Sequence, residues 1–535
     1  MKTEYPFYEI EHELSTVRDV IGLTEKSYRE NPVFCYKEGK EIKNKSKKEF
    51  LSDIERMETL FHNFLDIGSH IAILGKTSYE WVISYFAAMC SENIAVPLDK
   101  ELSAEDLKTL IHFADVNCLI FDKEYQDVAK QLSDDKSMNI QYICMHEVAG
   151  FSGLNKMLSE IDTMVLWKGN PIPEDVAEIV FTSGTTGKSK GCMITHQNLA
   201  WNVMNGSSFT DLKSKDKILS ILPVNHALEI TAGIMTPMYC GVTVCINESL
   251  KYLRRNLLIY RPQCMVVVPL VLRTLYKDIW KEIEKGKQGL RVKVAMKMAQ
   301  FLKKCHIDIR RKLFKQILEP LGGDLCLMVC GGAYLEPQII KDFEAWGINI
   351  VQGYGITECA PVVTCNTDRY KKYDSVGKVV TGCDVKIIED EICVRGPIVM
   401  KGYYKDQEAT DELFKGEWFK TGDMGYLDKD GYLYITGRKK NLIILSNGEN
   451  VAPEELEQKI MCFAYVKEVL ISEVNGQICA EVFLDKEIQP DAEVKIQEDI
   501  TALNKQLPNY KKIGKTIIRN QEFEKTSTRK IKRKY

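Results

Sequence analysis

The sequence predicts an α/β protein: a large N-terminal domain of parallel βαβ layers with a small β-rich subdomain, followed by a small α+β domain. Three observations predict this fold. From about residue 70, short β-branched runs alternate with helical patterns. After about residue 380 the pattern changes to short strands separated by Gly and Asp turns, and the last hundred residues begin a new α+β pattern.

The N-terminal elements follow one another regularly. Residues 71–74 predict a strand, residues 80–89 an amphipathic helix and residues 94–98 a second strand. A helix that begins with a capping serine is expected over 103–113, and a third strand over 118–121. Further strands are expected at 217–222, 242–246, 264–268 and 325–330, with helices between them. Because strand–helix–strand connections join parallel strands, this order predicts parallel sheets.

The remaining elements are shorter. The turn Asp428-Lys429-Asp430-Gly431 between residues 424–427 and 432–435 predicts a β-hairpin. The C-terminal part is expected to contain a strand at 442–445, a helix from about Pro453, strands at 468–472 and 478–484, and a helix at about 493–506.

The composition narrows the class of protein. A chain of 535 residues exceeds one ordinary domain, and its 45% hydrophobic and 27% charged content is typical of a globular enzyme. The net charge of −3 gives no reason to expect nucleic acid as a partner. The 17 cysteines form no CxxC pair and the N-terminus resembles no signal sequence, so we expect the cytoplasm as the compartment.

Two segments need separate interpretation. The most apolar window, 227–246, is interrupted by Glu229 and Pro237, which predicts a buried helix followed by a strand and not a membrane span. A peripheral contact with a membrane is left open. Residues 286–316 are strongly basic and helical in pattern, and we interpret them as a solvated helical insertion.

The most informative segment is residues 181–191, Phe-Thr-Ser-Gly-Thr-Thr-Gly-Lys-Ser-Lys-Gly, which follows an apolar run at 177–181. Glycines allow backbone N–H groups to surround an anion, and lysines add charge for a phosphate. The segment is not a P-loop of the GxxxxGK[ST] type, because Thr182 stands where that pattern needs glycine. We therefore expect a loop for a nucleotide's phosphates, with a polar surface loop as the alternative.

Three further clusters contain residue types that are suited to nucleotide binding. The motif GYGITE, residues 353–358, contains Glu358, which could hold a hard cation, and Tyr354, whose ring offers a flat face for a base. The motif WFKTGD ends in Asp423, whose two oxygens could accept from both ribose hydroxyls. The third cluster comprises Gly437-Arg438-Lys439-Lys440-Asn441 and residues 446–457. Each cluster alone is compatible with an ordinary turn, hairpin corner or helix start.

In this combination and order, the chain resembles the adenylate-forming enzymes: acyl-CoA synthetases, peptide-synthetase adenylation domains and luciferases. The resemblance runs from about residue 70 to the C-terminus, through FTSGTTGKSKG, GYGITE, WFKTGD, GRKKNLI and KTSTRKIKR. ILPVNHALEI and LSNGENVAPEELE are most similar to long-chain fatty acyl-CoA ligases. The resemblance implies an AMP- and acyl-binding domain over 1–437 and a mobile lid domain over 438–535, with a hinge at Lys440.

The resemblance also implies roles for individual residues. Lys530 would be the catalytic lysine that enters the site during adenylation, His226 would lie near the acyl carboxylate, and Glu358 with Thr185 would lie near Mg²⁺. The loop Thr182–Lys190 would hold the triphosphate. The ATP-binding residues would be Thr182, Ser183, Gly184, Thr185, Thr186, Gly187, Lys190, Gly331, Gly332, Ala333, Tyr354, Gly355, Thr357, Asp423 and Arg438.

The implied reaction is activation of a carboxylic acid, in the first instance a medium- or long-chain fatty acid. MgATP and the acid would give acyl-adenylate and pyrophosphate, and CoA would then displace AMP. One alternative is a stand-alone enzyme that loads the phosphopantetheine of a carrier protein or acts on an aryl or amino acid; the lack of an appended carrier domain favours free CoA. Another is a binding or regulatory protein that has lost catalysis, which the intact Lys530, Glu358, Asp423 and Arg438 argue against.

Overall fold

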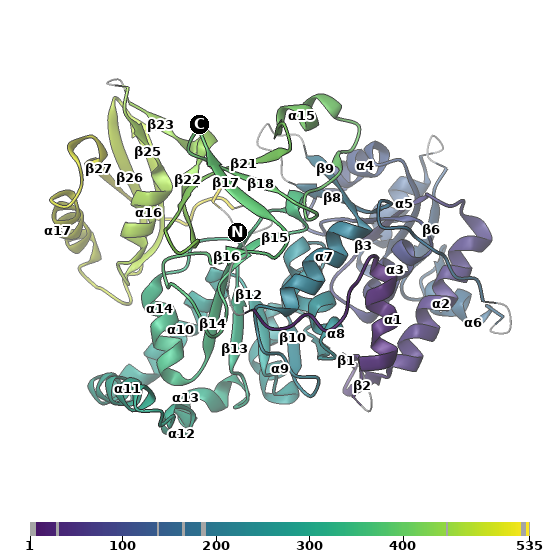
Figure 1. The fold of residues 1–535 in the computed structure, drawn as a ribbon, viewed down its shortest axis with the longest axis horizontal. Coiled ribbons are helices and arrows are strands. Elements are labelled where there is room, and N and C mark those ends of the chain that lie inside the picture. The colour runs from purple at the N-terminus through teal and green to yellow at the C-terminus, as the bar shows by residue number, and fades with distance from the viewer. Residues whose placement is uncertain are drawn as a thin grey trace.

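The computed structural model describes residues 7–27, 31–135, 139–162, 166–182, 189–445, 448–525 and 531–533. Within these residues the chain is α/β, with two large sheets, a smaller antiparallel sheet and a separate α+β unit (Figure 1). The predicted fold class is confirmed. No described helix combines the length and the hydrophobicity needed to cross a bilayer.

The first large sheet has the strand order β19-β9-β8-β4-β3-β5-β6-β7. Its strands from β8 to β7 are parallel, whereas β9 and β19 add antiparallel strands at one edge. All five residues of β3 are buried, as expected for a strand covered on both faces. The strands are β3 (His70–Leu74), β4 (Ile94–Pro97), β5 (Val116–Phe121), β6 (Gln141–Cys144), β7 (Ser152–Gly153), β8 (Val176–Thr182), β9 (Lys190–Thr195) and β19 (Gly402–Tyr403).

The second large sheet has the order β16-β15-β14-β13-β12-β10-β11-β1-β2. Its central strands from β14 to β1 are parallel, and antiparallel strands close both edges. The strands are β1 (Phe34–Glu38), β2 (Glu41–Lys45), β10 (Lys217–Ser220), β11 (Thr243–Ile246), β12 (Cys264–Val267), β13 (Leu327–Cys330), β14 (Asn349–Gly355), β15 (Val362–Cys365) and β16 (Lys378–Val379).

Helices fill the space between and around these sheets. α1 (Val17–Ser27) contacts α3 (Tyr79–Cys90), α7 (His196–Ser207) and α8 (Thr236–Tyr239), and one continuous hydrophobic core includes residues of both sheets. Side chains of Ser78 and Ser103 cap α3 and α4, as the sequence predicts for α4. The other helices of this domain are α2 (Lys47–Phe64), α4 (Ala104–Phe113), α5 (Gln126–Ser133), α6 (Leu154–Ser159), α9 (Leu253–Tyr260), α10 (Pro269–Lys285), α11 (Gly289–Lys304), α12 (Arg310–Leu313), α13 (Lys315–Leu318) and α14 (Pro337–Trp346).

The apolar window at 227–246 is buried, as predicted, but its helix is unusual. Residues Glu229–Met235 form a π-helix (η2) that continues into α8 and is followed by β11. π-Helical turns are rare and are often found at functional sites. The 17 cysteines are free thiols; the strand predicted at 325–330 begins at Leu327, so Cys330 is buried on β13 whereas Cys326 precedes the strand and is exposed.

The β-rich subdomain and the C-terminal unit follow the expected order. The first contains β17 (Asp384–Ile388), β18 (Glu391–Arg395), α15 (Gln407–Glu412), β20 (Phe414–Lys415), β21 (Trp418–Leu427) and β22 (Leu433–Arg438), and β21 and β22 form the predicted hairpin. The second contains β23 (Ile443–Ile444), β24 (Asn450–Val451), α16 (Pro453–Met461), β25 (Val466–Val474), β26 (Gln477–Leu484), α17 (Ala492–Asn504) and β27 (Ile513–Arg519). The C-terminal unit has its own hydrophobic core, between residues 451 and 513.

Helix α7 anchors distant loops through buried asparagines. The Asn202 side chain donates to the carbonyl of Cys359 at 2.8 Å and accepts from the amide of Val362 at 3.0 Å. Asn198 donates to the carbonyls of Pro397 and Val399 at 2.7 and 3.0 Å. These contacts hold the turn after β14 and the segment before β19 against one helix.

Replacing Asn202 by alanine should therefore destabilise the protein. Asn202→Ala removes the hydrogen-bond partner of the buried Cys359 carbonyl and of the half-buried Val362 amide, which costs about 1–3 kcal/mol for each group left unsatisfied. Urea unfolding monitored by fluorescence should show a lower midpoint. Gln197→Ala, at an exposed position of the same helix, is the control and should leave the midpoint unchanged. Equal midpoints for the two variants would contradict this role of Asn202.

Candidate active site

Several loops meet at the carboxyl ends of the parallel strands in the second large sheet. A Cβ atom placed on Gly331, directly after β13, would lie 3.5 Å from the Leu228 side chain and 3.6 Å from the carbonyl oxygen of Gly353. Gly332 has φ = +86° and would have only Val268 within 4 Å of such an atom. Gly332 and exposed Ala333 therefore border open space at the sheet edge where ligands of open α/β sheets bind, and Gly331 is packed behind them.

Asp423 is the centre of a buried polar cluster. Its carboxylate is 4% exposed and lies opposite Arg438 in the β21–β22 hairpin. Arg438 Nε is 2.7 Å from Asp423 Oδ1, and the Tyr354 hydroxyl donates to Asp423 Oδ2 at 2.7 Å. Thus three of the predicted ATP-binding residues, far apart in the sequence, are in direct contact.

The hydroxyl of Tyr354 stays protonated in this cluster. Burial, together with the nearby Asp423 charge, raises the pKa of Tyr354 well above its usual value, so its hydroxyl remains a donor. A carboxylate has about four acceptor positions. Arg438 and Tyr354 occupy some of them, and the remaining capacity of Asp423 can accept hydroxyl donors of a ligand.

A second cluster contains Glu358, which follows β14 in η5 (Thr357–Cys359). Glu358 Oε1 accepts a hydrogen bond from the Tyr403 hydroxyl at 2.9 Å. The ammonium of Lys190 lies 4.8 Å from the centroid of the Tyr403 ring. Tyr403 therefore connects the end of the predicted phosphate loop with the predicted cation ligand. Tyr403 was not predicted from the sequence, because nothing in the local pattern of residues 402–404 distinguishes it.

The predicted phosphate loop and the segment that contains Lys530 lie only partly within the described residues. Ser183, Gly184, Thr185, Thr186, Gly187 and Lys530 lie outside the described residues. Thr182 and Lys190 pair across β8 and β9, so the loop joins two adjacent antiparallel strands. The residues that flank the Lys530 segment, Lys525 and Ile531, form an antiparallel bridge, and Lys525 forms ion pairs with Glu468 and Glu522 of the C-terminal unit.

The predicted hinge lies between two anchored residues. Lys439 forms an ion pair of 2.8 Å with Glu391 of β18, in the large domain. Asn441 donates to Glu454 of α16, in the C-terminal unit. Lys440, in η6 (Lys439–Asn441), is exposed and separates these two attachments. This position is suited to a change of backbone angle between the domains.

The loop after β10 carries His226 and is supported by a buried acid. His226 is half-buried, and its carbonyl accepts from the amide of Glu229 at 3.0 Å. Glu229 is fully buried and accepts from the Ser220 hydroxyl at 2.5 Å. Gly233 makes room for it, since a Cβ there would lie 2.8 Å from the Glu229 carboxyl carbon. In the sequence Glu229 stood out only as an interruption of an apolar window.

Burial raises the pKa of Glu229 to about 8, against a smaller lowering by hydrogen bonds from Ser220 and the amides of Leu222 and Ile221. Glu229 is therefore a neutral acid near pH 7, and it ties the end of β10 to the start of η2. This contact fixes the loop that carries His226 against the sheet edge.

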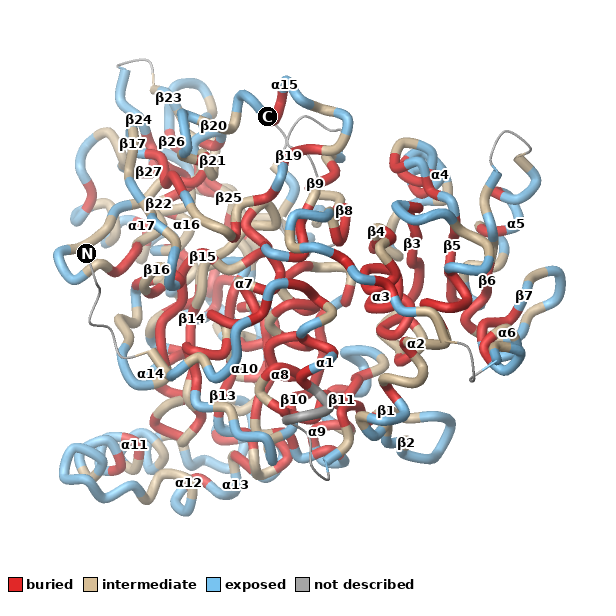
Figure 2. Tube along the Cα trace, turned by 45° about the vertical axis from the view of Figure 1, so that its right-hand side comes forward, coloured by how far each residue is buried: buried red, intermediate tan, exposed pale blue. Residues whose placement is uncertain are grey.

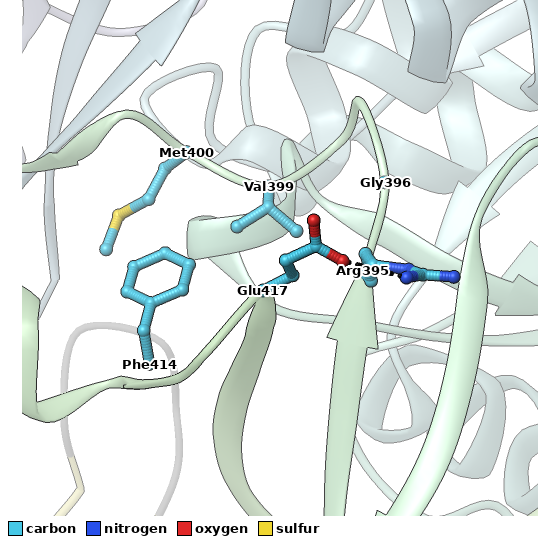
Figure 3. A pocket seen from close by; sticks show the side chains of 6 residues that line it. All are labelled: Arg395, Gly396, Val399, Met400, Phe414 and Glu417. Atoms are coloured by element: carbon cyan, nitrogen blue, oxygen red, sulfur yellow. Dashed lines mark hydrogen bonds and ion pairs between the residues drawn. The ribbon is translucent and has the colours of Figure 1, made fainter.

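A surface depression of about 480 Å³ lies between the end of β18 and β20 (Figure 3). Figure 3 shows Arg395 and Glu417 at one side, joined by an ion pair of 3.0 Å, and Met400 and Phe414 at the other. The amide of Met400 donates to the Glu358 carbonyl at 2.9 Å. The depression is thus a neighbour of the Glu358 cluster, and its lining contains none of the predicted site residues.

The structure thus combines a large α/β domain and a small C-terminal unit, with two polar clusters near the carboxyl edge of a parallel sheet. Comparison with known families agrees. Residues 31–404 match the family described as AMP-binding enzyme, and residues 440–535 match the AMP-binding enzyme C-terminal domain. The chain therefore belongs to the AMP-binding, adenylate-forming enzyme family.

Individual relatives are consistent with this assignment. The chain is 29% identical over 450 residues to the long-chain-fatty-acid–CoA ligase FadD15 of Mycobacterium bovis, covering 78% of this chain and 74% of that protein. It is 27% identical to the long-chain-fatty-acid–[acyl-carrier-protein] ligase AEE15 of Arabidopsis thaliana, covering 75% and 66%. Among solved structures, the anthranilate CoA ligase AuaEII in complex with anthranoyl-AMP has a TM-score of 0.80 at 18% identity, covering 99% and 97%.

The pKa of Glu229 predicts a specific pH dependence of stability. A carboxyl with a raised pKa stabilises the folded state fully below its unfolded pKa, and this contribution is lost as pH rises through the folded value of about 8. We expect Glu229→Gln, which cannot ionise, to lose less stability than the wild type between pH 6 and pH 9, by on the order of 1–3 kcal/mol.

Urea unfolding of both proteins at several pH values measures this difference. Two stability curves that stay parallel across the range would contradict a neutral buried Glu229.

Proposed function

We propose that this protein is an AMP-forming acid–thiol ligase that activates a medium- or long-chain fatty acid with ATP and transfers the acyl group to CoA. The observation that carries the proposal is the contact of Asp423 with Arg438 and Tyr354 at a sheet edge bordered by Gly331 and Gly332. This arrangement suits a nucleoside whose ribose meets a carboxylate and whose base lies against glycines and an aromatic ring. The similarity to the Mycobacterium bovis fatty acid ligase supports the substrate class.

Each part of ATP has a proposed partner. The base would lie between Gly331-Gly332-Ala333 and Tyr354, close to Gly355 and Thr357, and the ribose hydroxyls would bind Asp423 and Arg438. The phosphates would be held by the loop Thr182–Lys190, where Lys190 supplies positive charge beside Tyr403.

The residues present fit a magnesium ion with ATP. Glu358 offers a hard carboxylate oxygen, the donor type that Mg²⁺ prefers. One oxygen accepts from Tyr403, and the other, Oε2, has no hydrogen-bond or ion-pair partner in the described part of the chain. Thr185 would complete the protein's share of the ligands. When bound, Mg²⁺ would offset negative charge on the phosphates.

The protein's own contribution is positioning and charge. The substrate carboxylate attacks the α-phosphorus, a P–O bond forms, and the bond to pyrophosphate breaks. Lys530 would stabilise the charge that develops at the α-phosphate. The thiol of CoA then attacks the acyl carbonyl near His226, and AMP leaves. Because Lys530 must leave before the thiol enters, a backbone change at Lys440 would rotate the C-terminal unit.

A second acceptor is proposed as the alternative: the phosphopantetheine of an acyl-carrier protein. The Arabidopsis thaliana relative named for that acceptor favours it. A screen of pyrophosphate release with short, medium, long-chain and aromatic acids, with CoA or acyl-carrier protein present or omitted, tests both. Fatty acid and CoA should give the highest turnover. If none of the acids supports pyrophosphate release, the proposed function is overturned. Acylation of carrier protein, with no acylation of CoA, would establish the alternative.

Lys530→Ala should separate the two half-reactions. We expect acid-dependent pyrophosphate release to fall by roughly 100-fold or more, as when a charged stabiliser of the transition state is removed. Thioester formation from supplied acyl-adenylate should remain close to wild type.

The matched control is Lys532→Ala, a nearby exposed lysine of the same tail, which should leave both half-reactions unchanged. Equal loss of both half-reactions in Lys530→Ala would refute the assigned role.

Asp423→Ala should weaken the binding of ATP much more than the binding of the acid substrate. The variant loses charge-assisted hydrogen bonds to the ribose, worth about 1.5–3 kcal/mol, so the Kd for ATP should rise roughly 10- to 100-fold. Isothermal titration with a non-hydrolysable ATP analogue measures this change, and Asp430→Ala, at the exposed hairpin tip, is the control. An unchanged Kd for the analogue would show that Asp423 does not bind ATP.

A further inference from the structure

Helix α11 exposes a stripe of large apolar side chains. Leu290, Val294, Met298 and Phe301 are 79, 60, 48 and 66% exposed. With about 100° between successive residues of an α-helix, these four side chains fall within an arc of roughly 80°. We call these four residues the α11 stripe. Four exposed apolar residues on one helix face differ from the scattered single ones of an ordinary surface.

The stripe is not the face that attaches the helix to the protein. Met296 and Ala299, on the opposite side, are buried, and α11 contacts α10, α12 and α14. Figure 2 shows α11 at the lower edge of the molecule, mostly exposed and projecting beyond the buried core. The helix therefore has two apolar faces, and only one of them is used for packing within the chain.

The surroundings of the stripe are strongly basic. Residues 285–304 contain seven Lys and Arg residues, and no acidic residue occurs between Glu284 and Asp308. On the helical wheel Lys293, Lys297 and Lys304 flank one side of the stripe and Arg291 the other. Arg291, Lys297 and Lys304 form no ion pair with any residue that the structure describes. Their charge is thus available to an external anionic partner.

The combination of features selects the partner. A nucleic acid would use the cations and leave the apolar side chains in water, and an acidic protein surface would do the same. A bilayer with anionic headgroups accepts both, because apolar side chains enter the acyl boundary while lysines remain among the phosphates. We propose that α11 binds the surface of an anionic lipid bilayer through the α11 stripe and its flanking lysines.

The basic segment 286–316 is largely helical, as expected. Under this proposal it binds a membrane surface and is more than a solvated insertion. The proposal does not depend on the acid being a fatty acid or on catalysis at all. If the substrate is a long-chain acid, both would meet at the same bilayer, since such acids partition into membranes.

Vesicle flotation of the full-length protein tests the proposal. Vesicles of phosphatidylglycerol and phosphatidylcholine should carry the protein upward at low ionic strength, and high salt should weaken this binding. Vesicles of phosphatidylcholine alone should bind much less. Absence of binding to the anionic vesicles at low salt, or equal binding to both kinds, would overturn the proposal.

Two sets of variants assign the binding to α11. The triple variant Lys293→Gln, Lys297→Gln, Lys304→Gln should bind about 100-fold more weakly, at roughly fivefold for each cation. Leu290→Gln with Phe301→Gln should weaken binding at least about tenfold, and glutamine preserves the helix. Val494→Gln on α17, where the valine is 63% exposed, is the matched control and should bind like wild type.

Far-ultraviolet circular dichroism and the midpoint of thermal unfolding serve as measures of intact structure. Both should remain at the wild-type level in all variants. Equal weakening by Val494→Gln would overturn the assignment to α11. Tighter binding to a mixed-sequence DNA duplex than to the anionic vesicles would overturn the choice of a lipid partner.

Discussion

The ion pair between Asp423 and Arg438 is the interaction on which the arrangement of the site depends. A carboxylate that is 4% exposed requires partners, and losing one of them leaves an uncompensated buried charge. Its two partners come from different parts of the fold: Tyr354 from the end of β14 and Arg438 from the end of β22. Since Arg438 immediately precedes the Lys439–Asn441 segment, the same pair fixes the point from which the C-terminal unit departs.

The two large sheets supply the rest of the site through a shared layer of helices. The predicted phosphate loop joins β8 and β9 of one sheet, whereas Gly331, Gly332 and Glu358 follow strands of the other and Tyr354 lies near the end of β14. Asn198 and Asn202 of α7 hold the loops around Glu358, and Tyr403 connects Glu358 to Lys190 across the sheets. A rigid frame of this kind is what positional catalysis requires, because orientation accounts for much of the rate gain when the protein performs little covalent chemistry.

Local patterns predicted the regular elements well, and long-range contacts could not be predicted. The strand at 71–74, the Ser103-capped helix and the 424–435 hairpin rest on neighbouring residues, and all of them are present. The contacts of Tyr403, Asn202 and Glu229 were not predicted, because the first two bond to residues 45 and 157 positions away and the third is defined by its burial. Likewise, the pattern of α11 shows apolar residues on two faces, and only the fold reveals which face is covered.

Transfer of ¹⁸O from a labelled carboxylic acid would distinguish attack at the α-phosphorus of ATP from attack at the γ-phosphorus. If the carboxylate attacks the α-phosphorus and a thiol then displaces AMP, one labelled oxygen should appear in AMP, detected by mass spectrometry after a turnover with ATP and CoA. We expect labelled AMP together with unlabelled pyrophosphate. Label in orthophosphate, with formation of ADP, would show attack at the γ-phosphorus and would contradict this expectation.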